Sequence, residues 1–309
     1  MLNIRDLGLI LLKEGNIQED ITKLDCSDNK LETLEGIDKC INLTILYCCG
    51  NCVKTLKGLE KCIKLTKLDC EYNKLETLEG IEKCNKLTEL NCSDNELKTL
   101  KGLEKCINLD KLYCYNNNLK TLRGLDKCIN LTKLDCYNNE LETLEGLEKC
   151  INLTELYCGY NKLEILEGLE KCINLNILYC NNNKIKSLEL LDKCINLTEL
   201  NCCKNRLETI EGIDKCINLD ILYCNNNKLE SLEGIEKCNK LTELDCRDNG
   251  LRELKYCPES IIYILYDNNP IKEEYRGRDI REIHRINKEK WERGIYKEVM
   301  KEDNFFYRK

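Results

Sequence analysis

A period of 22 residues runs through most of the chain and restricts its fold more than any other feature. Asparagine recurs at this step without a slip, at Asn29, Asn51, Asn73, Asn95, Asn117, Asn139, Asn161, Asn183, Asn205, Asn227 and Asn249. Self-similarity at a fixed step of about 20 to 50 residues is the signature of stacked repeats, in which each unit buries its core against its neighbours. The period therefore predicts one continuous solenoid.

Cysteine forms two further ladders with the same step. The first follows the motif Leu-x-Cys, at Cys26, Cys48, Cys70, Cys92, Cys114, Cys136, Cys158, Cys180, Cys202, Cys224 and Cys246. The second comprises Cys40, Cys62, Cys84, Cys106, Cys128, Cys150, Cys172, Cys194, Cys216 and Cys238. Free cysteine is among the most buried residue types and packs as a small apolar side chain. We interpret both ladders as core thiols and expect Cys49, Cys52 and Cys203, which lie outside them, to be the most exposed.

The 25 cysteines also allow a second hypothesis, a metal-thiolate or redox store. Tetrahedral zinc needs four converging ligands, whereas the thiols of a ladder point in parallel into a packed interior. Cys49 and Cys52 form a Cys-x-x-Cys motif, but no second pair follows at the spacing of a zinc finger. Disulfide frameworks are typical of short secreted chains. We therefore expect reduced thiols in an intracellular compartment, with no metal and no other cofactor.

Residues 65–86 show how the ladders fit into one unit. Leu68 and Cys70 alternate with polar residues, which predicts a short strand with one face inward. Asn73 follows where the chain turns, and we expect its amide to bond the backbone of its own coil and of the next. Gly80 allows a sharp bend before the return leg, which we expect to be irregular or a short 3-10 turn. Stacked copies then form a parallel sheet with strands about 4.8 Å apart.

The unit resembles the leucine-rich repeat LxxLxLxxNxLxxLxxLxxL, in the 22-residue version of internalins and of the phosphatase-regulator subfamily. The resemblance covers about residues 21–271, with two core leucines replaced by cysteine. It implies an α/β solenoid: a curved horseshoe arc with a parallel sheet on its concave face, short return legs and terminal helical caps. The near-identity of the units and the residue usage are also similar to repeat proteins of large DNA viruses of amoebae and of intracellular microbes.

Three segments are expected along the chain. Residues 1–20 carry apolar side chains at near-helical spacing and should cap the N-terminal coil. The array follows over residues 21–271 in about 12 units, of which the last is shortened to 20 residues around Pro258. Residues 272–309 should form a helical C-terminal cap or tail. A helix is predicted from Arg278 onward, broken near Gly294, on the spacing of Ile280, Ile283, Trp291, Ile295 and Val299.

Charge and motifs exclude several classes of function. The net charge is −7 and no basic field covers the repeats, which disfavours nucleic acid as a partner. No apolar stretch reaches about 18 residues, so we expect no membrane partner. The only histidine, His284, lies outside the array, so the repeats cannot build a Ser-His or Cys-His pair. We expect a protein that is not an enzyme, located in the cytoplasm of its source or of a host cell.

A partner surface is predicted where the repeat is free to vary. Tyrosine occupies one outward strand column at Tyr47, Tyr113, Tyr157, Tyr179 and Tyr223, the next at Tyr115 and Tyr137, and the turn beyond at Tyr72 and Tyr160. Tyrosine is favoured in interfaces because it buries a large area and keeps a polar tip. The alternative is that tyrosine is merely tolerated on these strands under an AT-rich codon bias.

The tripeptide Asn-Leu-Thr also recurs, at Asn42, Asn130, Asn152 and Asn196. It matches a glycosylation acceptor. The repeat itself generates it, however, so it carries no meaning without export.

The leading hypothesis is a monomeric scaffold or adaptor that binds a partner protein on its concave face. The resemblance implies a second one, a regulatory subunit of a protein phosphatase, because Asn269-Pro270-Ile271 followed by Tyr275-Arg276 resembles the closing motif of that subfamily. An adhesin similar to the internalins and a thiol or metal store are further hypotheses.

Overall fold

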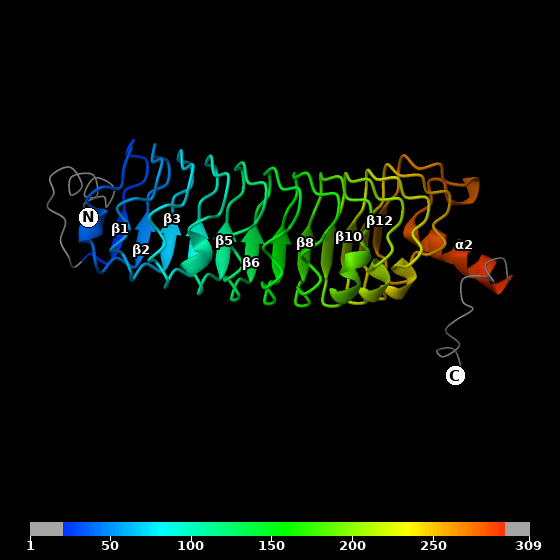
Figure 1. Ribbon diagram of the computed structural model, residues 1–309. Helices are drawn as coiled ribbons and strands as arrows, with labels where there is room; N and C mark the ends of the chain where they lie inside the picture. Colours follow the sequence, from blue (N-terminus) through cyan, green and yellow to red (C-terminus); the bar gives the residue numbers. More distant parts are fainter. Residues whose placement is uncertain (1–20, 294–309) are drawn as a thin grey trace, which may run out of the picture.

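The computed structural model describes residues 21–293, so the expected N-terminal cap and the end of the tail lie outside the described residues. The chain winds into successive coils, and each coil adds one three-residue strand to a single parallel sheet (Figure 1). The strands, which pair in chain order, are β1 (Lys23–Asp25), β2 (Ile45–Tyr47), β3 (Lys67–Asp69), β4 (Glu89–Asn91), β5 (Lys111–Tyr113), β6 (Lys133–Asp135), β7 (Glu155–Tyr157), β8 (Ile177–Tyr179), β9 (Glu199–Asn201), β10 (Ile221–Tyr223), β11 (Glu243–Asp245) and β12 (Tyr263–Leu265). The predicted solenoid is confirmed.

The register of the sheet follows the sequence period. Leu112 of β5 pairs with Leu134 of β6, 22 residues later. The last pair is Leu244 with Ile264, a step of 20 residues. Because the inward residue of each strand faces the same residue type in the next coil, one continuous core runs through the stack.

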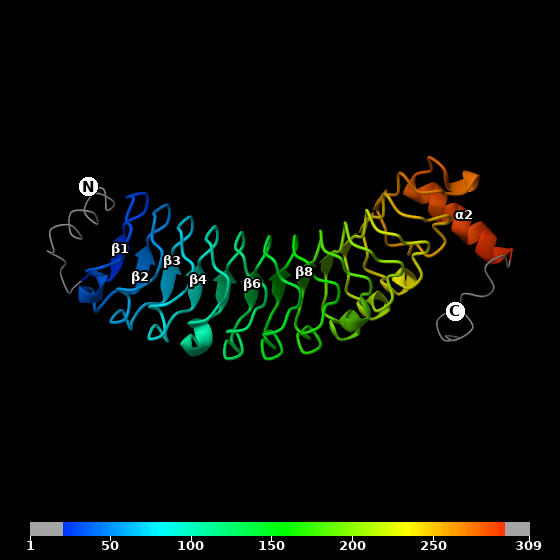
Figure 2. The same ribbon diagram turned by 45° about the horizontal axis from the view of Figure 1, so that its top comes forward.

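The solenoid is curved, with the sheet on the concave side and the return legs on the convex side (Figure 2). Some return legs contain a 3-10 helix: η1 (Ile37–Lys39), η2 (Leu103–Lys105), η3 (Glu189–Lys193), η4 (Ile213–Lys215), η5 (Ile235–Lys237) and η6 (Glu273–Tyr275). The other return legs within the described residues are turns and irregular chain. Both expected forms of return leg therefore occur.

The core consists of leucine, isoleucine and the two cysteine ladders. Ladder members such as Cys92 and Cys106 are fully buried, as are the strand leucines Leu90 and Leu112. All 25 cysteines are free thiols, and all are buried except Cys49, Cys52 and Cys203, which are half-buried. Those three are the ones that the register predicts to be most exposed, so the prediction is confirmed. The small thiol fits where the coil is narrow and leaves no polar group that needs a strong partner.

The asparagine ladder bonds the coils together, but not in the direction expected. Nδ2 of Asn73 donates to the carbonyl oxygen of Cys70 in its own coil at 3.0 Å and to that of Cys48 in the preceding coil at 2.9 Å. Its Oδ1 accepts from the backbone N–H of Val53, also in the preceding coil. The expectation that the amide reaches the next coil is wrong. The side chain leans backward because the turn of the preceding coil presents the N–H of Val53, which has no other partner among the described residues, beside the carbonyl oxygen of Cys48.

Glycine sets the bend before each return leg. Gly146 has φ +113, and a Cβ there would lie 2.3 Å from the carbonyl oxygen of Leu122 in the preceding coil. No side chain fits at this place without moving that backbone. Leu190 replaces the glycine in one unit, and there the chain forms the five-residue η3 in place of the sharp bend.

A helix follows the last coil. α2 (Ile280–Glu292) begins at Asp279, whose carboxylate accepts from the backbone N–H of Glu282. Ile283 is fully buried, and Nδ2 of Asn287 donates to the carbonyl oxygen of Leu254 at 2.9 Å. The helix thus packs over the end of the core. Gly294 and the expected continuation through Ile295 and Val299 lie outside the described residues.

Candidate partner-binding face

The candidate site is the concave face of the sheet. In each strand from β2 to β10 the middle residue is buried and its two neighbours are half-buried, as for Glu155 and Tyr157 beside Leu156. The predicted tyrosines Tyr47, Tyr113, Tyr157, Tyr179 and Tyr223 are the last residues of β2, β5, β7, β8 and β10. They therefore stand on the outer face of a backbone that is fixed by pairing on both sides.

Four tyrosines form two ring pairs near the middle of this face, and we call them the central tyrosines: Tyr137, Tyr157, Tyr160 and Tyr179. The ring centroids of Tyr157 and Tyr179 are 5.2 Å apart with the planes at 68°, an edge-to-face arrangement. Those of Tyr137 and Tyr160 are 4.9 Å apart at 50°. Such pairs attract one another beyond the area they bury. Tyr160 reaches Tyr137 from a turn position with φ +53.

The other predicted tyrosines do not join this cluster. The ring of Tyr47 lies 5.3 Å from Nζ of Lys23 near the N-terminal end. Tyr223 is separated from Tyr179 by Asn201 of β9. The hydroxyl of Tyr115 donates to Glu71, two coils earlier. The tyrosines therefore form one central group with outlying members instead of a continuous aromatic column.

Charged partners of the tyrosines were not identified from the sequence. The hydroxyl of Tyr157 donates to Glu155 at 3.2 Å, and that of Tyr179 donates to Glu199. Nζ of Lys133 lies 2.6 Å from the carboxylate of Glu155 and 5.1 Å from the ring centroid of Tyr157. The sequence does carry a pattern that could have indicated them: the first residue of every strand from β1 to β11 is Lys, Glu or Ile.

These contacts hold the phenols in their protonated form. Burial and the hydrogen bond to Glu243 raise the pKa of Tyr223 to about 12. Burial and Glu199 raise the pKa of Tyr179 further, and burial also raises that of Tyr157. Each hydroxyl therefore stays a donor to its carboxylate at neutral pH, which fixes the ring in one orientation. The face therefore presents aromatic rings that are ordered before anything binds to them.

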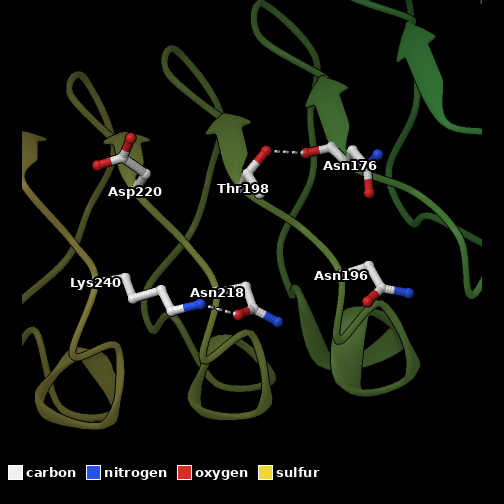
Figure 3. Close-up of a pocket in the computed structure, with 6 residues that line it drawn as sticks. All are labelled: Asn176, Asn196, Thr198, Asn218, Asp220 and Lys240. Atoms are coloured by element: carbon white, nitrogen blue, oxygen red, sulfur yellow. Dashed lines mark hydrogen bonds between the residues drawn. The ribbon is translucent and has the colours of Figure 1, made fainter.

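A polar hollow of about 550 Å³ lies on the flank, away from the central tyrosines (Figure 3). Its lining is Asn176, Asn196, Thr198, Asn218, Asp220 and Lys240. Nζ of Lys240 donates to Asn218 at 2.7 Å, and Oγ1 of Thr198 donates to the carbonyl oxygen of Asn176 at 3.1 Å. The lining thus presents amide, hydroxyl, carboxylate and ammonium groups to one space.

The structure describes residues 21–293. In this part of the chain no three His, Cys, Asp or Glu side chains are placed to hold a metal ion. No helix there has both the length and the apolar character needed to cross a membrane.

Comparison with protein families identifies the repeat. The model described as Leucine Rich repeats (2 copies) matches overlapping windows from residues 20–61 to residues 217–259. The chain belongs to the leucine-rich-repeat family. Among curated proteins the sequence has no match.

Solved structures of leucine-rich-repeat proteins share the fold. The functional domain of InlJ from Listeria monocytogenes, which includes a cysteine ladder, has 32% identity and a TM-score of 0.74 over 85% of this chain. This chain spans 56% of that domain. A leucine-rich-repeat protein of Leptospira interrogans has 22% identity and a TM-score of 0.74, over 87% of this chain and 82% of its own. The internalin InlF of Listeria monocytogenes has 20% identity and a TM-score of 0.70, over 98% and 95%.

Proposed function

We propose that this leucine-rich-repeat protein is a non-enzymatic scaffold or adaptor that binds a partner protein on its concave face. Leucine-rich repeats commonly mediate protein–protein interaction, and one relative of the fold, the plant peptide hormone receptor RGFR1, is solved in complex with RGF2. The central tyrosines are the observation that carries the proposal. They put the pair Tyr157 and Tyr179 on neighbouring strands of a rigid sheet, and the pair Tyr137 and Tyr160 just beyond the strand ends.

The arrangement suits binding for an energetic reason. A tyrosine that is already ordered loses little side-chain entropy when a partner covers it. Tyr157 and Tyr179 are held by each other and by Glu155 and Glu199 before any partner arrives. The carboxylates beside the rings add a preference for a partner that brings basic or amide donors to the same place.

The phosphatase-regulator alternative has no separate support in the geometry. Asn269 of its closing motif completes the asparagine ladder by donating to Cys246 at 2.9 Å. Tyr275 is fully buried between the last coil and α2. Both residues are accounted for by closing the core. We also propose a reducing cytoplasmic location, which 25 free thiols favour, and a monomer as the binding unit.

The test is a pull-down from a candidate host cytosol, followed by binding measurements on the recovered partner. Tyr157→Ala combined with Tyr179→Ala should weaken that partner more than about tenfold, because truncating a buried interface tyrosine costs about 2 kcal/mol or more. Glu145→Ala with Glu167→Ala, on the return legs, is the matched control and should leave the affinity unchanged. If the control pair abolishes binding while the tyrosine pair retains it, the partner does not sit on the concave face.

A further inference from the structure

A row of isoleucines lies exposed along one flank, between the return legs and the strands. Six of them occupy consecutive coils, and we call these six the isoleucine row: Ile107, Ile129, Ile151, Ile173, Ile195 and Ile217. Each is 49% to 56% exposed. Contiguous exposed apolar surface is rare on monomeric proteins and marks interaction sites. The row does not belong to the core, because the leucine two residues later in each coil already fills that place.

The row is held rigid by a second asparagine ladder. Nδ2 of Asn152 donates to the carbonyl oxygen of Ile129 in the preceding coil at 2.9 Å. The same bond recurs at 3.0 Å from Asn130 to Ile107, Asn174 to Ile151, Asn196 to Ile173 and Asn218 to Ile195. Figure 3 shows Asn196 and Asn218 at this level of the flank, between the return legs and the strands. These asparagines thus fix the backbone of Ile107 and of the next four isoleucines of the row, so a partner meets a preordered surface.

Lysine borders the row on the side of the return legs. Lys105, Lys127, Lys149 and Lys171 are exposed two residues before an isoleucine. Among the residues that the structure describes, these four form no ion pair within 4 Å, whereas Lys193 and Lys215, beside the last two isoleucines, pair with Asp192 and Asp214. The carboxylates that precede them are occupied: Glu148 and Glu170 accept from the backbone N–H of Gly146 and Gly168 at 3.0 Å. From Ile107 to Ile173 the flank therefore offers an apolar stripe beside ammonium groups that form no ion pair.

We propose that the isoleucine row is a second docking surface and that its occupant is an acidic amphipathic α-helix of a partner protein. Leucine-like side chains of that helix would cover the isoleucines, and its carboxylates would pair with the lysines. This surface lies apart from the central tyrosines, so one molecule could hold two partners at once. The proposal does not depend on the function proposed for the concave face.

The spacing of the coils favours a helix over an extended strand. Coils are about 4.8 Å apart at the sheet, and their separation increases away from the concave side of the arc (Figure 2). An α-helix has a pitch of about 5.4 Å, so one turn meets one coil. Side chains on one face of a strand recur only every ~6.7 Å and fall out of step within two coils. Five coil steps correspond to a helix of roughly 16 to 18 residues.

The probe for the test is a labelled synthetic peptide of about 18 residues, with leucine on one helical face and glutamate on both borders of that face. Its affinity for the full chain is measured by fluorescence anisotropy. The triple variant Ile129→Asn, Ile151→Asn and Ile173→Asn should bind it at least about tenfold more weakly. The fold accommodates this change, because Asn85 and Asn239 already occupy the equivalent place in their coils and are exposed. Lys127→Glu with Lys149→Glu and Lys171→Glu should weaken binding to a similar extent.

Further measurements distinguish an acidic helix from other occupants of the row. Tyr157→Ala with Tyr179→Ala should leave the affinity for the peptide unchanged, and a peptide with lysine in place of glutamate should not bind. Equal binding of both peptides, or no effect of the isoleucine variant, overturns the proposal. So does a result in which the isoleucine variant loses binding to phosphatidylserine vesicles while the peptide never binds. Sedimentation that shows a dimer of the native chain and a monomer of the isoleucine variant would assign the row to self-association instead.

Discussion

Nδ2 of Asn139 donates at 3.0 Å to the carbonyl oxygen of Cys114, one coil earlier, while its Oδ1 accepts from the backbone N–H of Leu119 in that same coil. One side chain thus pairs the N–H of Leu119 and adds a second bond to a carbonyl that already accepts from Asn117. Both bonds are buried, where an unpaired polar group has no water to replace its partner.

Replacing this amide should therefore destabilise the stack. Asn139→Ala leaves the buried N–H of Leu119 without a partner, and we expect the free energy of unfolding to fall by about 1 to 3 kcal/mol. Urea unfolding followed by circular dichroism measures the change. Asn118→Ala is the matched control, since Asn118 is exposed in the same turn region, and it should shift the free energy by less than about 0.5 kcal/mol. Equal effects of the two substitutions would contradict a structural role for the ladder.

Two glycines separate backbone strain from steric conflict. Gly146 and Gly234 have similar φ values, +113 and +109, but an added Cβ meets the carbonyl oxygen of Leu122 at 2.3 Å in the first case and nothing closer than 3.7 Å in the second. Gly234→Ala should cost about 1 to 2 kcal/mol through its positive φ alone. Gly146→Ala should cost about 1 to 3 kcal/mol more, because the preceding coil must move. Thermal unfolding of both variants tests the order, and a milder effect at Gly146 would refute it.

The buried thiols should make the protein sensitive to alkali. Burial raises the pKa of Cys92 from 9.0 to about 12 and that of Cys194 to about 11. A folded-state pKa above the unfolded value contributes stability that is fully present below the unfolded pKa and is lost as the pH rises toward the folded pKa. Each fully buried thiol such as Cys92 should therefore cost about 1.4 kcal/mol at a pH of about 10. With this many thiols, we expect unfolding between about pH 9 and 10, measured by circular dichroism.

A single substitution provides the control for that titration. Cys92→Ala should lower the free energy of unfolding at neutral pH through the cavity it leaves. Because the variant releases about one proton fewer on unfolding at alkaline pH, its free energy of unfolding should fall less steeply as the pH rises. A free energy of unfolding that stays constant up to about pH 10 would show that the ladder thiols ionise freely in the folded chain.

Thiol labelling should distinguish three cysteines from the rest. Cys49, Cys52 and Cys203 are half-buried, and the other cysteines are buried. Burial raises the pKa of Cys49 and Cys203, so their modification should be slow at neutral pH and accelerate as the pH rises. Mass spectrometry after a short exposure of the native protein to a maleimide should find these three sites. The variant with serine at all three positions should remain unlabelled until denatured; rapid modification of most thiols would exclude the core role.

The sequence by itself determined the features that each coil repeats. Strand, bend, asparagine ladder and buried thiols follow from the 22-residue period, because each depends on contacts with an identical neighbour one coil away. For the same reason the register alone predicts that Cys49, Cys52 and Cys203 are less buried than the ladder thiols. Such contacts need no knowledge of the distant chain.

The tertiary structure decided what depends on side-chain direction and on differences between coils. It turned the amide of Asn73 toward the preceding coil, brought Tyr137 to Tyr160 but Tyr115 to Glu71, and left the isoleucine row uncovered beside its lysines. A repeat pattern gives the column in which a residue stands. It does not give the rotamer that the residue adopts or the neighbour it finds, because both are set by packing against non-identical coils on either side.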